Sequence, residues 1–129
     1  MIVKPSLLIV EDDLENQRYL DILLRNFYQV EVCDCASSFY KQMANKKFDL
    51  ILMDISLAGP KDGLQLTREL KSNPIFKTIP VVALSAHAFQ KDKDNAYKAG
   101  IDLYLTKPIL KNHLLEALEK ILRQKFESC

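Results

Sequence analysis

The sequence has no excess of either charge, no long apolar run and no low-complexity stretch. Its 18 lysines and arginines against 17 aspartates and glutamates leave a formal net charge of +1. A generic nucleic-acid binder shows a basic excess, and an acidic disordered tail shows the opposite. No apolar run approaches the ~20 residues of a bilayer span, and the first residues lack the apolar stretch of a signal peptide. These absences predict a cytoplasmic protein that contacts neither nucleic acid nor a membrane.

Cysteine is also scarce, and its odd count excludes a complete set of disulfides. The three cysteines are Cys33, Cys35 and Cys129, which fits a reducing compartment better than a secreted disulfide scaffold. We expect Cys33 and Cys35 to pack as small residues beside helices, and to share one face if both lie on a strand. A thiol metal site would need further ligands, which the sequence does not offer. Cys129 is expected to be exposed.

The apolar residues are arranged in short runs over one domain, residues 1–129. Three runs without polar alternation predict strands buried on both faces of a parallel sheet: Leu7–Val10, Leu50–Met53 and Val81–Leu84. Two alternating runs, Val30–Cys33 and Ile101–Leu105, predict edge strands.

A helical pattern follows each predicted strand. The expected helices carry Leu20, Leu23, Leu24 and Phe27 after an N-cap at Asp13; Ala36, Phe39, Tyr40 and Met43; Leu66 and Leu70 between Gly63 and Pro74; a weak set from Ala88 to Gly100; and Leu114 to Leu122. Five alternating strand–helix units predict an α/β fold, a doubly wound parallel sheet with helices on both faces.

Chemically active side chains stand where the predicted strands end. They are Glu11, Asp12 and Asp13 after the first strand, Asp54 after the third, Ser85 after the fourth and Lys107 after the fifth. The carboxyl ends of parallel strands meet at one edge of the sheet. Clustered carboxylates repel one another, and a hard cation such as Mg²⁺ or Mn²⁺ relieves this. With a lysine and a hydroxyl nearby, the set suits phosphoryl transfer to a carboxylate.

Each of these groups also has a simpler interpretation when it is taken alone. An acidic triplet complements a helix start, an aspartate such as Asp54 forms turns, Ser85 could be an N-cap and Lys107 a surface charge. Four separate loops that bring the required groups to one edge favour a single site.

In four segments the chain resembles the receiver domain of two-component response regulators. The segments are Leu8–Asp13, Leu50–Ser56, Val81–Ala86 and Tyr104–Pro108, and the likeness covers a core of about residues 6–122. The family fold is a flavodoxin-like (βα)5 sheet with strand order 2-1-3-4-5, which agrees with the predicted central and edge strands.

The resemblance implies a role for each of these residues. Asp54 accepts a phosphoryl group from the phosphohistidine of a histidine kinase or a histidine phosphotransfer protein. Mg²⁺ binds to Asp12, Asp54 and the backbone carbonyl of Ser56, with Glu11 acting through a water. Lys107 and Ser85 contact the phosphoryl group, Tyr104 turns inward as the switch residue, and a cis bond precedes Pro108.

The resemblance also implies an output through protein contacts rather than enzymatic turnover. The face of the fourth helix, fifth strand and fifth helix would control a downstream protein, and the chain would be a monomer or a weak phosphorylation-dependent dimer. Its only chemistry would be self-catalysed uptake and loss of the phosphoryl group. The loop Leu57–Gly63 departs from the family pattern, lacking a proline at position 58 and being one residue longer. His87 at the pocket rim is expected to be surface decoration.

Three other functions remain open from the residues. A docking module that is never phosphorylated would share the fold but not need the intact acids, Ser85 and Lys107. A Mg²⁺-dependent phosphatase of the haloacid dehalogenase type needs a second aspartate where this chain has Ser56. A flavin-binding module needs a phosphate loop where Glu11–Asp13 would repel a phosphate. The chain could stand alone or be a piece of a longer regulator or hybrid kinase; the initial methionine and short tail favour the former.

Overall fold

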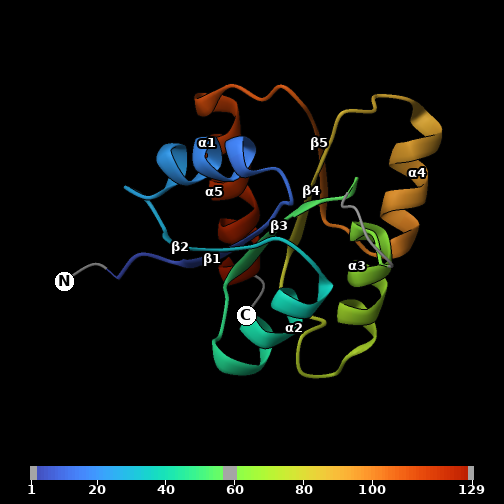
Figure 1. The fold of residues 1–129 in the computed structure, drawn as a ribbon, viewed down its shortest axis with the longest axis horizontal. Helices are drawn as coiled ribbons and strands as arrows, with labels where there is room; N and C mark the ends of the chain where they lie inside the picture. Colours follow the sequence, from blue (N-terminus) through green and yellow to red (C-terminus); the bar gives the residue numbers. More distant parts are fainter. Residues whose placement is uncertain (1–2, 57–60, 128–129) are drawn as a thin grey trace.

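The computed structural model describes residues 3–56 and 61–127. In these residues five strands and five helices alternate (Figure 1). The strands are β1 (Ser6–Val10), β2 (Gln29–Cys33), β3 (Leu50–Asp54), β4 (Val81–Ser85) and β5 (Leu103–Thr106). The helices are α1 (Leu14–Leu24), α2 (Ala36–Asn45), α3 (Gly63–Ser72), α4 (Gln90–Ala99) and α5 (Lys111–Glu127).

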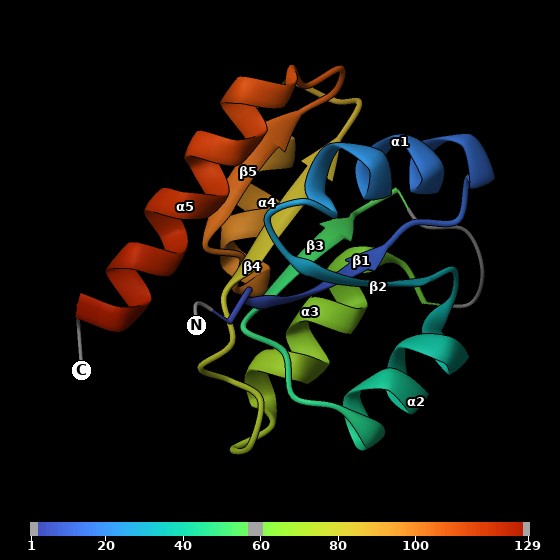
Figure 2. The same ribbon diagram turned by 90° about the vertical axis from the view of Figure 1, so that its left-hand side faces the viewer.

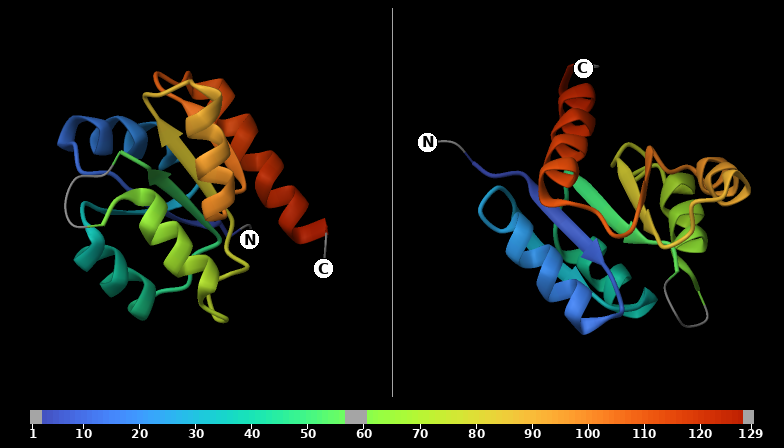
Figure 3. Two further views of the ribbon diagram at one scale, coloured as in Figure 1. Left: turned by 90° about the vertical axis from the view of Figure 1, so that its right-hand side faces the viewer. Right: turned by 90° about the horizontal axis from the view of Figure 1, so that it is seen from above.

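All four strand pairings are parallel, and the strand order is β2-β1-β3-β4-β5. The predicted order is therefore confirmed, with β2 and β5 at the edges. Helices α1 and α5 cover one face of the sheet, and α2, α3 and α4 cover the other (Figure 2; Figure 3, left). No helix in the described part of the chain is long and apolar enough to cross a membrane.

The central strands supply apolar side chains to both faces at once. In β1, Leu8 and Val10 join the cluster under α2, α3 and α4, whereas Leu7 and Ile9 join the cluster under α1 and α5. Alternate strand residues point to opposite faces, so a strand covered on both sides must be apolar throughout. This is why unbroken apolar runs became β1, β3 and β4.

Some element ends differ from the sequence prediction. Helix α1 ends at Leu24, so Phe27, which has the spacing of the next helical turn, lies outside it and is 48% exposed. The chain instead turns there, with the Phe27 N–H donating to the Leu24 carbonyl. Strand β5 begins at Leu103 rather than Ile101, and Ile101 is buried just before it.

The predicted helix signals at Asp13 and Gly100 are confirmed. The Asp13 carboxylate accepts a hydrogen bond from the Asn16 N–H and caps α1. Gly100 ends α4 with a φ of 111°, a left-handed conformation that favours glycine. The weak pattern expected for the fourth helix is also borne out, because α4 buries only Ala96 and Ala99.

Cys33 and Cys35 do not both lie on a strand, so the condition for a shared face is not met. Cys33 ends β2 and is buried, whereas Cys35 lies beyond the strand as the N-cap of α2 and is exposed. The strand therefore stops too early for the two-residue alternation to apply. Cys129 and most of the unusual loop, residues 57–60, lie outside the described residues.

Candidate functional site

The site residues predicted from four loops meet at the carboxyl edge of the sheet. Among the described residues, the buried polar or charged side chains are those of Glu11, Asp54, Thr67 and Ser85, and three of these four were predicted. Burying a carboxylate costs free energy unless it is paired. The burial of Glu11 and Asp54 together at this edge therefore indicates a functional site rather than ordinary turns and helix caps.

Three carboxylates form a compact cluster at this edge. One oxygen each from Glu11, Asp12 and Asp54 lies within 4.8 Å of the others. Glu11 and Asp54 are buried, whereas Asp12 is exposed, so the cluster opens to solvent on the Asp12 side. An all-oxygen donor set of this kind fits Mg²⁺ or Mn²⁺ and is poor for Zn²⁺.

Lys107, from the end of β5, supplies the positive charge that faces the buried acids. Its Nζ lies 2.9 Å from Glu11 Oε1 and 3.4 Å from Asp54 Oδ2. Burial alone would lower the pKa of the Lys107 ammonium, but the two carboxylates outweigh it and hold that pKa above its ordinary value. Lys107 thus stays charged and links β5 to β1 and β3.

The Glu11 carboxyl binds its proton more tightly than a free glutamate does. Burial, and next the hydrogen-bonding contact with Asp54, raise the pKa of Glu11 from 4.5 to about 7, although Lys107 opposes the shift. One ammonium cannot neutralise two buried carboxylates. The cluster therefore has spare affinity for a further positive charge, which either a proton or a divalent cation can satisfy.

Backbone contacts hold Asp54 in place. Its Oδ1 accepts a hydrogen bond from the Ser56 N–H at 2.8 Å. On the other side α3 begins so close to the strand that a Cβ on Gly63 would overlap the Asp54 carbonyl and lie 2.7 Å from Ile55 Cα. Buried Thr67 donates from Oγ1 to the Gly63 carbonyl at 2.7 Å. From sequence Gly63 marked only a helix start, and no periodic signal reveals this close approach.

Ser85 and Tyr104 meet at the loop between β4 and α4. Ser85 Oγ accepts a hydrogen bond from the His87 N–H at 3.0 Å, and the Tyr104 hydroxyl donates to the His87 carbonyl at 2.7 Å. Tyr104 is 8% exposed, so its side chain lies inward. The His87 side chain is exposed, and the Lys107–Pro108 peptide bond is cis.

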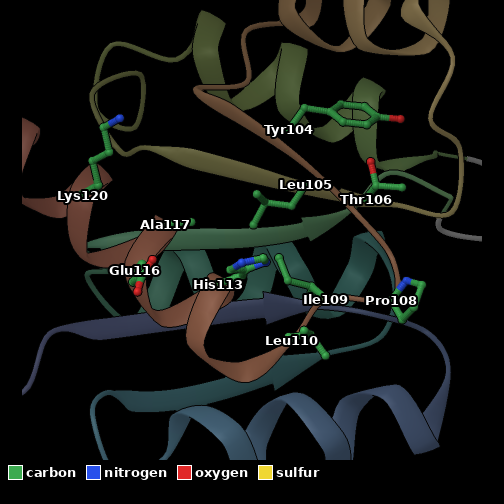
Figure 4. A pocket seen from close by; sticks show the side chains of 10 residues that line it. All are labelled: Tyr104, Leu105, Thr106, Pro108, Ile109, Leu110, His113, Glu116, Ala117 and Lys120. Atoms are coloured by element: carbon green, nitrogen blue, oxygen red, sulfur yellow. The ribbon is translucent and has the colours of Figure 1, made fainter.

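A shallow pocket of about 570 Å³ lies beside the site, between β5 and α5 (Figure 4). Apolar side chains, among them Leu105, Ile109 and Leu110, line one part of it, and His113, Glu116 and Lys120 line another. Glu11, Asp12 and Asp54 are not among its lining residues. The pocket therefore belongs to the outer face of β5 and α5, not to the carboxylate cluster.

The chain matches the sequence pattern of a known domain family. The profile of the response regulator receiver domain matches residues 7–119. The signal transduction histidine-protein kinase BarA of Escherichia coli is 33% identical over 110 residues, 84% of this chain but 12% of that kinase. The chain thus spans a small part of this relative.

Two solved structures of receiver domains are similar to this fold over most of the chain. The receiver domain of sensor histidine kinase PA1611 from Pseudomonas aeruginosa is 30% identical, with a TM-score of 0.84 over 93% of this chain and 98% of that one. That domain holds a magnesium ion in its active site cleft. The receiver domain of a histidine kinase from Syntrophus aciditrophicus is 29% identical, with a TM-score of 0.84 over 93% of this chain and 91% of that one.

The profile begins at the second residue of β1 and ends in the middle of α5, and the clustered acids, Ser85 and Lys107 lie at or just after strand ends within the matched region. The chain therefore belongs to the response regulator receiver domain family of two-component signalling.

Proposed function

We propose that Asp54 accepts a phosphoryl group from the phosphohistidine of a histidine kinase or a histidine phosphotransfer protein, in a reaction that depends on Mg²⁺. The observation that carries this proposal is the placement of Asp54. Its carboxylate is nearly buried, shares a cluster with Glu11 and Asp12, and has the Lys107 ammonium 3.4 Å away. Free thiols at Cys33 and Cys35 suit a cytoplasmic location.

The transfer exchanges one bond to phosphorus for another. An Asp54 carboxylate oxygen attacks phosphorus, the P–N bond to the donor imidazole breaks, and that nitrogen keeps the electron pair. Asp12, Asp54 and the Ser56 carbonyl would hold Mg²⁺, with Glu11 acting through a water, and the ion would neutralise charge on the phosphoryl oxygens. Lys107 would turn from the carboxylates to a phosphoryl oxygen.

The response would pass through the loop between β4 and α4. A phosphoryl group on Asp54 adds about two negative charges, and Ser85 Oγ would donate a hydrogen bond to it. Ser85 Oγ now accepts from the His87 N–H, so this move alters the segment that Tyr104 also holds. The face formed by α4, β5 and α5 would then bind a downstream protein, with the chain as a monomer or a weak phosphorylation-dependent dimer.

Phosphoryl uptake tests the proposal directly. We expect the protein, incubated with acetyl phosphate and Mg²⁺, to gain the mass of one phosphoryl group, and to gain none in excess EDTA. Asp54→Asn should abolish the gain. The matched control is Asp94→Asn, which removes an exposed acid of α4 and should leave the gain unchanged.

Two outcomes contradict the proposal. A mass gain that survives Asp54→Asn would assign the phosphoryl group to another residue. No gain from acetyl phosphate or from any phosphorylated histidine kinase would favour a docking module that is never phosphorylated. Transfer rates against a panel of phosphorylated kinases and phosphotransfer proteins would identify the donor.

A further inference from the structure

A tyrosine of α4 forms a hydrogen bond to the backbone at the outer edge of β5. Tyr97 lies near the end of α4, and its hydroxyl oxygen accepts a hydrogen bond from the backbone N–H of Tyr104 at 3.2 Å. Among the strands of the described residues, β5 pairs with β4 alone, so N–H groups on the other side of β5 have no strand partner there. The Tyr97 hydroxyl provides an acceptor for the backbone N–H of Tyr104.

Tyr104 therefore holds α4 at both ends. Its side-chain hydroxyl donates to the His87 carbonyl, three residues before α4 begins, and its backbone N–H donates to Tyr97, two residues before α4 ends. The first bond connects Tyr104 to the loop after β4, in which the His87 N–H donates to Ser85 Oγ. The second connects the same residue to the far end of the helix.

Little else fixes α4 on the sheet. The helix buries only Ala96 and Ala99, and its N-cap residue Phe89 makes no side-chain cap and is 75% exposed. Within the described residues, no other α4 side chain forms a hydrogen bond to a strand. An element with few buried apolar contacts opens at low free energy cost, so one hydrogen bond has a large share in holding it.

We propose that Tyr97 is a positioning residue for the switch: its hydroxyl holds α4 against the edge of β5 at Tyr104 and so sets how far α4 responds to phosphorylation. The part that concerns the response to phosphorylation rests on the proposed function. A phosphoryl group that draws Ser85 away from the His87 N–H loosens the first end of α4, and the Tyr97 bond decides whether the other end follows.

Amide hydrogen exchange of Tyr97→Phe tests the inference, because this substitution removes the hydroxyl and keeps the ring. The matched control is Tyr19→Phe on α1. Tyr19 is 48% exposed, like Tyr97 at 47%, and its hydroxyl also makes one bond to a backbone group, the Ile109 carbonyl. In the resting protein we expect the Tyr104 amide to exchange about fivefold faster in Tyr97→Phe than in wild type, and α4 amides to follow, with no such change in Tyr19→Phe.

The second measurement adds acetyl phosphate and Mg²⁺. We expect phosphoryl uptake by mass to be equal in wild type and Tyr97→Phe, but the exchange difference in α4 between resting and phosphorylated protein to shrink in the variant. Unchanged Tyr104 exchange in resting Tyr97→Phe, or an unchanged phosphorylation-dependent difference in α4, overturns the inference. Absence of uptake by wild type overturns the proposed function instead, while the resting comparison still decides whether Tyr97 positions α4.

Discussion

At the scale of single residues, the buried acidic groups of the site outnumber the basic group that pairs with them. Glu11 and Asp54 are both buried, and both contact the single ammonium of Lys107. Three groups with two negative charges and one positive charge leave one charge unpaired in a place where water cannot fully screen it. This arrangement, together with burial, raises the pKa of Glu11, and it also favours the binding of a cation.

The raised pKa of Glu11 predicts how stability depends on pH. Between pH 4.5 and about 7 the folded protein keeps a proton on Glu11 that the unfolded chain releases. The free energy of unfolding without Mg²⁺ should therefore fall as pH rises through this window, by up to about 1.4 kcal/mol per pH unit, and level off above pH 7. Urea unfolding at several pH values measures this.

Glu11→Gln is the control for that pH dependence, because an amide cannot titrate. Between pH 4.5 and about 7, the unfolding free energy of wild type should fall relative to that of Glu11→Gln as pH rises. If Mg²⁺ binds this cluster as proposed, it competes with the Glu11 proton, so the affinity for Mg²⁺ should rise with pH through the same range. A wild-type curve parallel to that of Glu11→Gln would contradict the raised pKa.

At the scale of secondary-structure elements, the start of α3 decides where Asp54 lies. The helix can approach the end of β3 only because residue 63 has no side chain. Asp62 caps α3 by accepting a hydrogen bond from the Gln65 N–H, which fixes the first turn at this point. The position of the Asp54 carboxylate thus depends on an element that contributes no side chain to the carboxylate cluster.

Gly63→Ala should therefore harm both stability and phosphoryl uptake. The added methyl group would overlap the Asp54 backbone, and we expect a loss of about 1–3 kcal/mol of unfolding free energy together with slower uptake from acetyl phosphate. The control is Gly100→Ala, which strains the positive φ at the end of α4. It should lower stability but leave the uptake rate unchanged. Equal uptake by wild type and Gly63→Ala would contradict this role for α3.

At the scale of the whole molecule, the end of the sheet opposite the site is held by a separate polar contact. Lys71, in the last turn of α3, donates to the Ile79 carbonyl at 2.7 Å and to Asp102 Oδ2 at 3.0 Å. The same Asp102 oxygen accepts the N–H of Val81, the first residue of β4, at 2.8 Å. One carboxylate thus joins α3, β4 and the approach to β5 at the end where these strands begin.

Asp102→Ala should destabilise the fold without touching the chemistry. It leaves the N–H of fully buried Val81 without its acceptor, which predicts a loss of about 1–3 kcal/mol in urea unfolding. Asp102→Asn keeps an acceptor and should lose less. Asp21→Ala breaks the exposed ion pair with Arg25 and should cost under about 1 kcal/mol. All three variants should take up a phosphoryl group as wild type does, and slower uptake by Asp102→Ala would contradict the separation of the two ends.

The sequence by itself determined the architecture and most members of the site. Unbroken apolar runs require burial on both faces, so they predicted β1, β3 and β4. Because the carboxyl ends of parallel strands meet at one edge, the sequence also predicted that Glu11, Asp54 and Lys107 lie close together. These signals are local, because each depends on neighbours within a few positions. Such signals did not determine where elements end, since Phe27 has helical spacing but lies beyond α1.

Only the tertiary structure decided how these groups act on one another. Lys107 meets Glu11 across 96 positions of the chain, and the burial that raises the Glu11 pKa comes from elements that no local pattern connects. The close approach of Gly63 to Asp54 and the bond from Tyr104 to Tyr97 likewise leave no periodic trace in the sequence. Ion pairs, steric overlap and hydrogen bonds depend on distances between atoms in space. These distances are set only when the helices pack against the sheet.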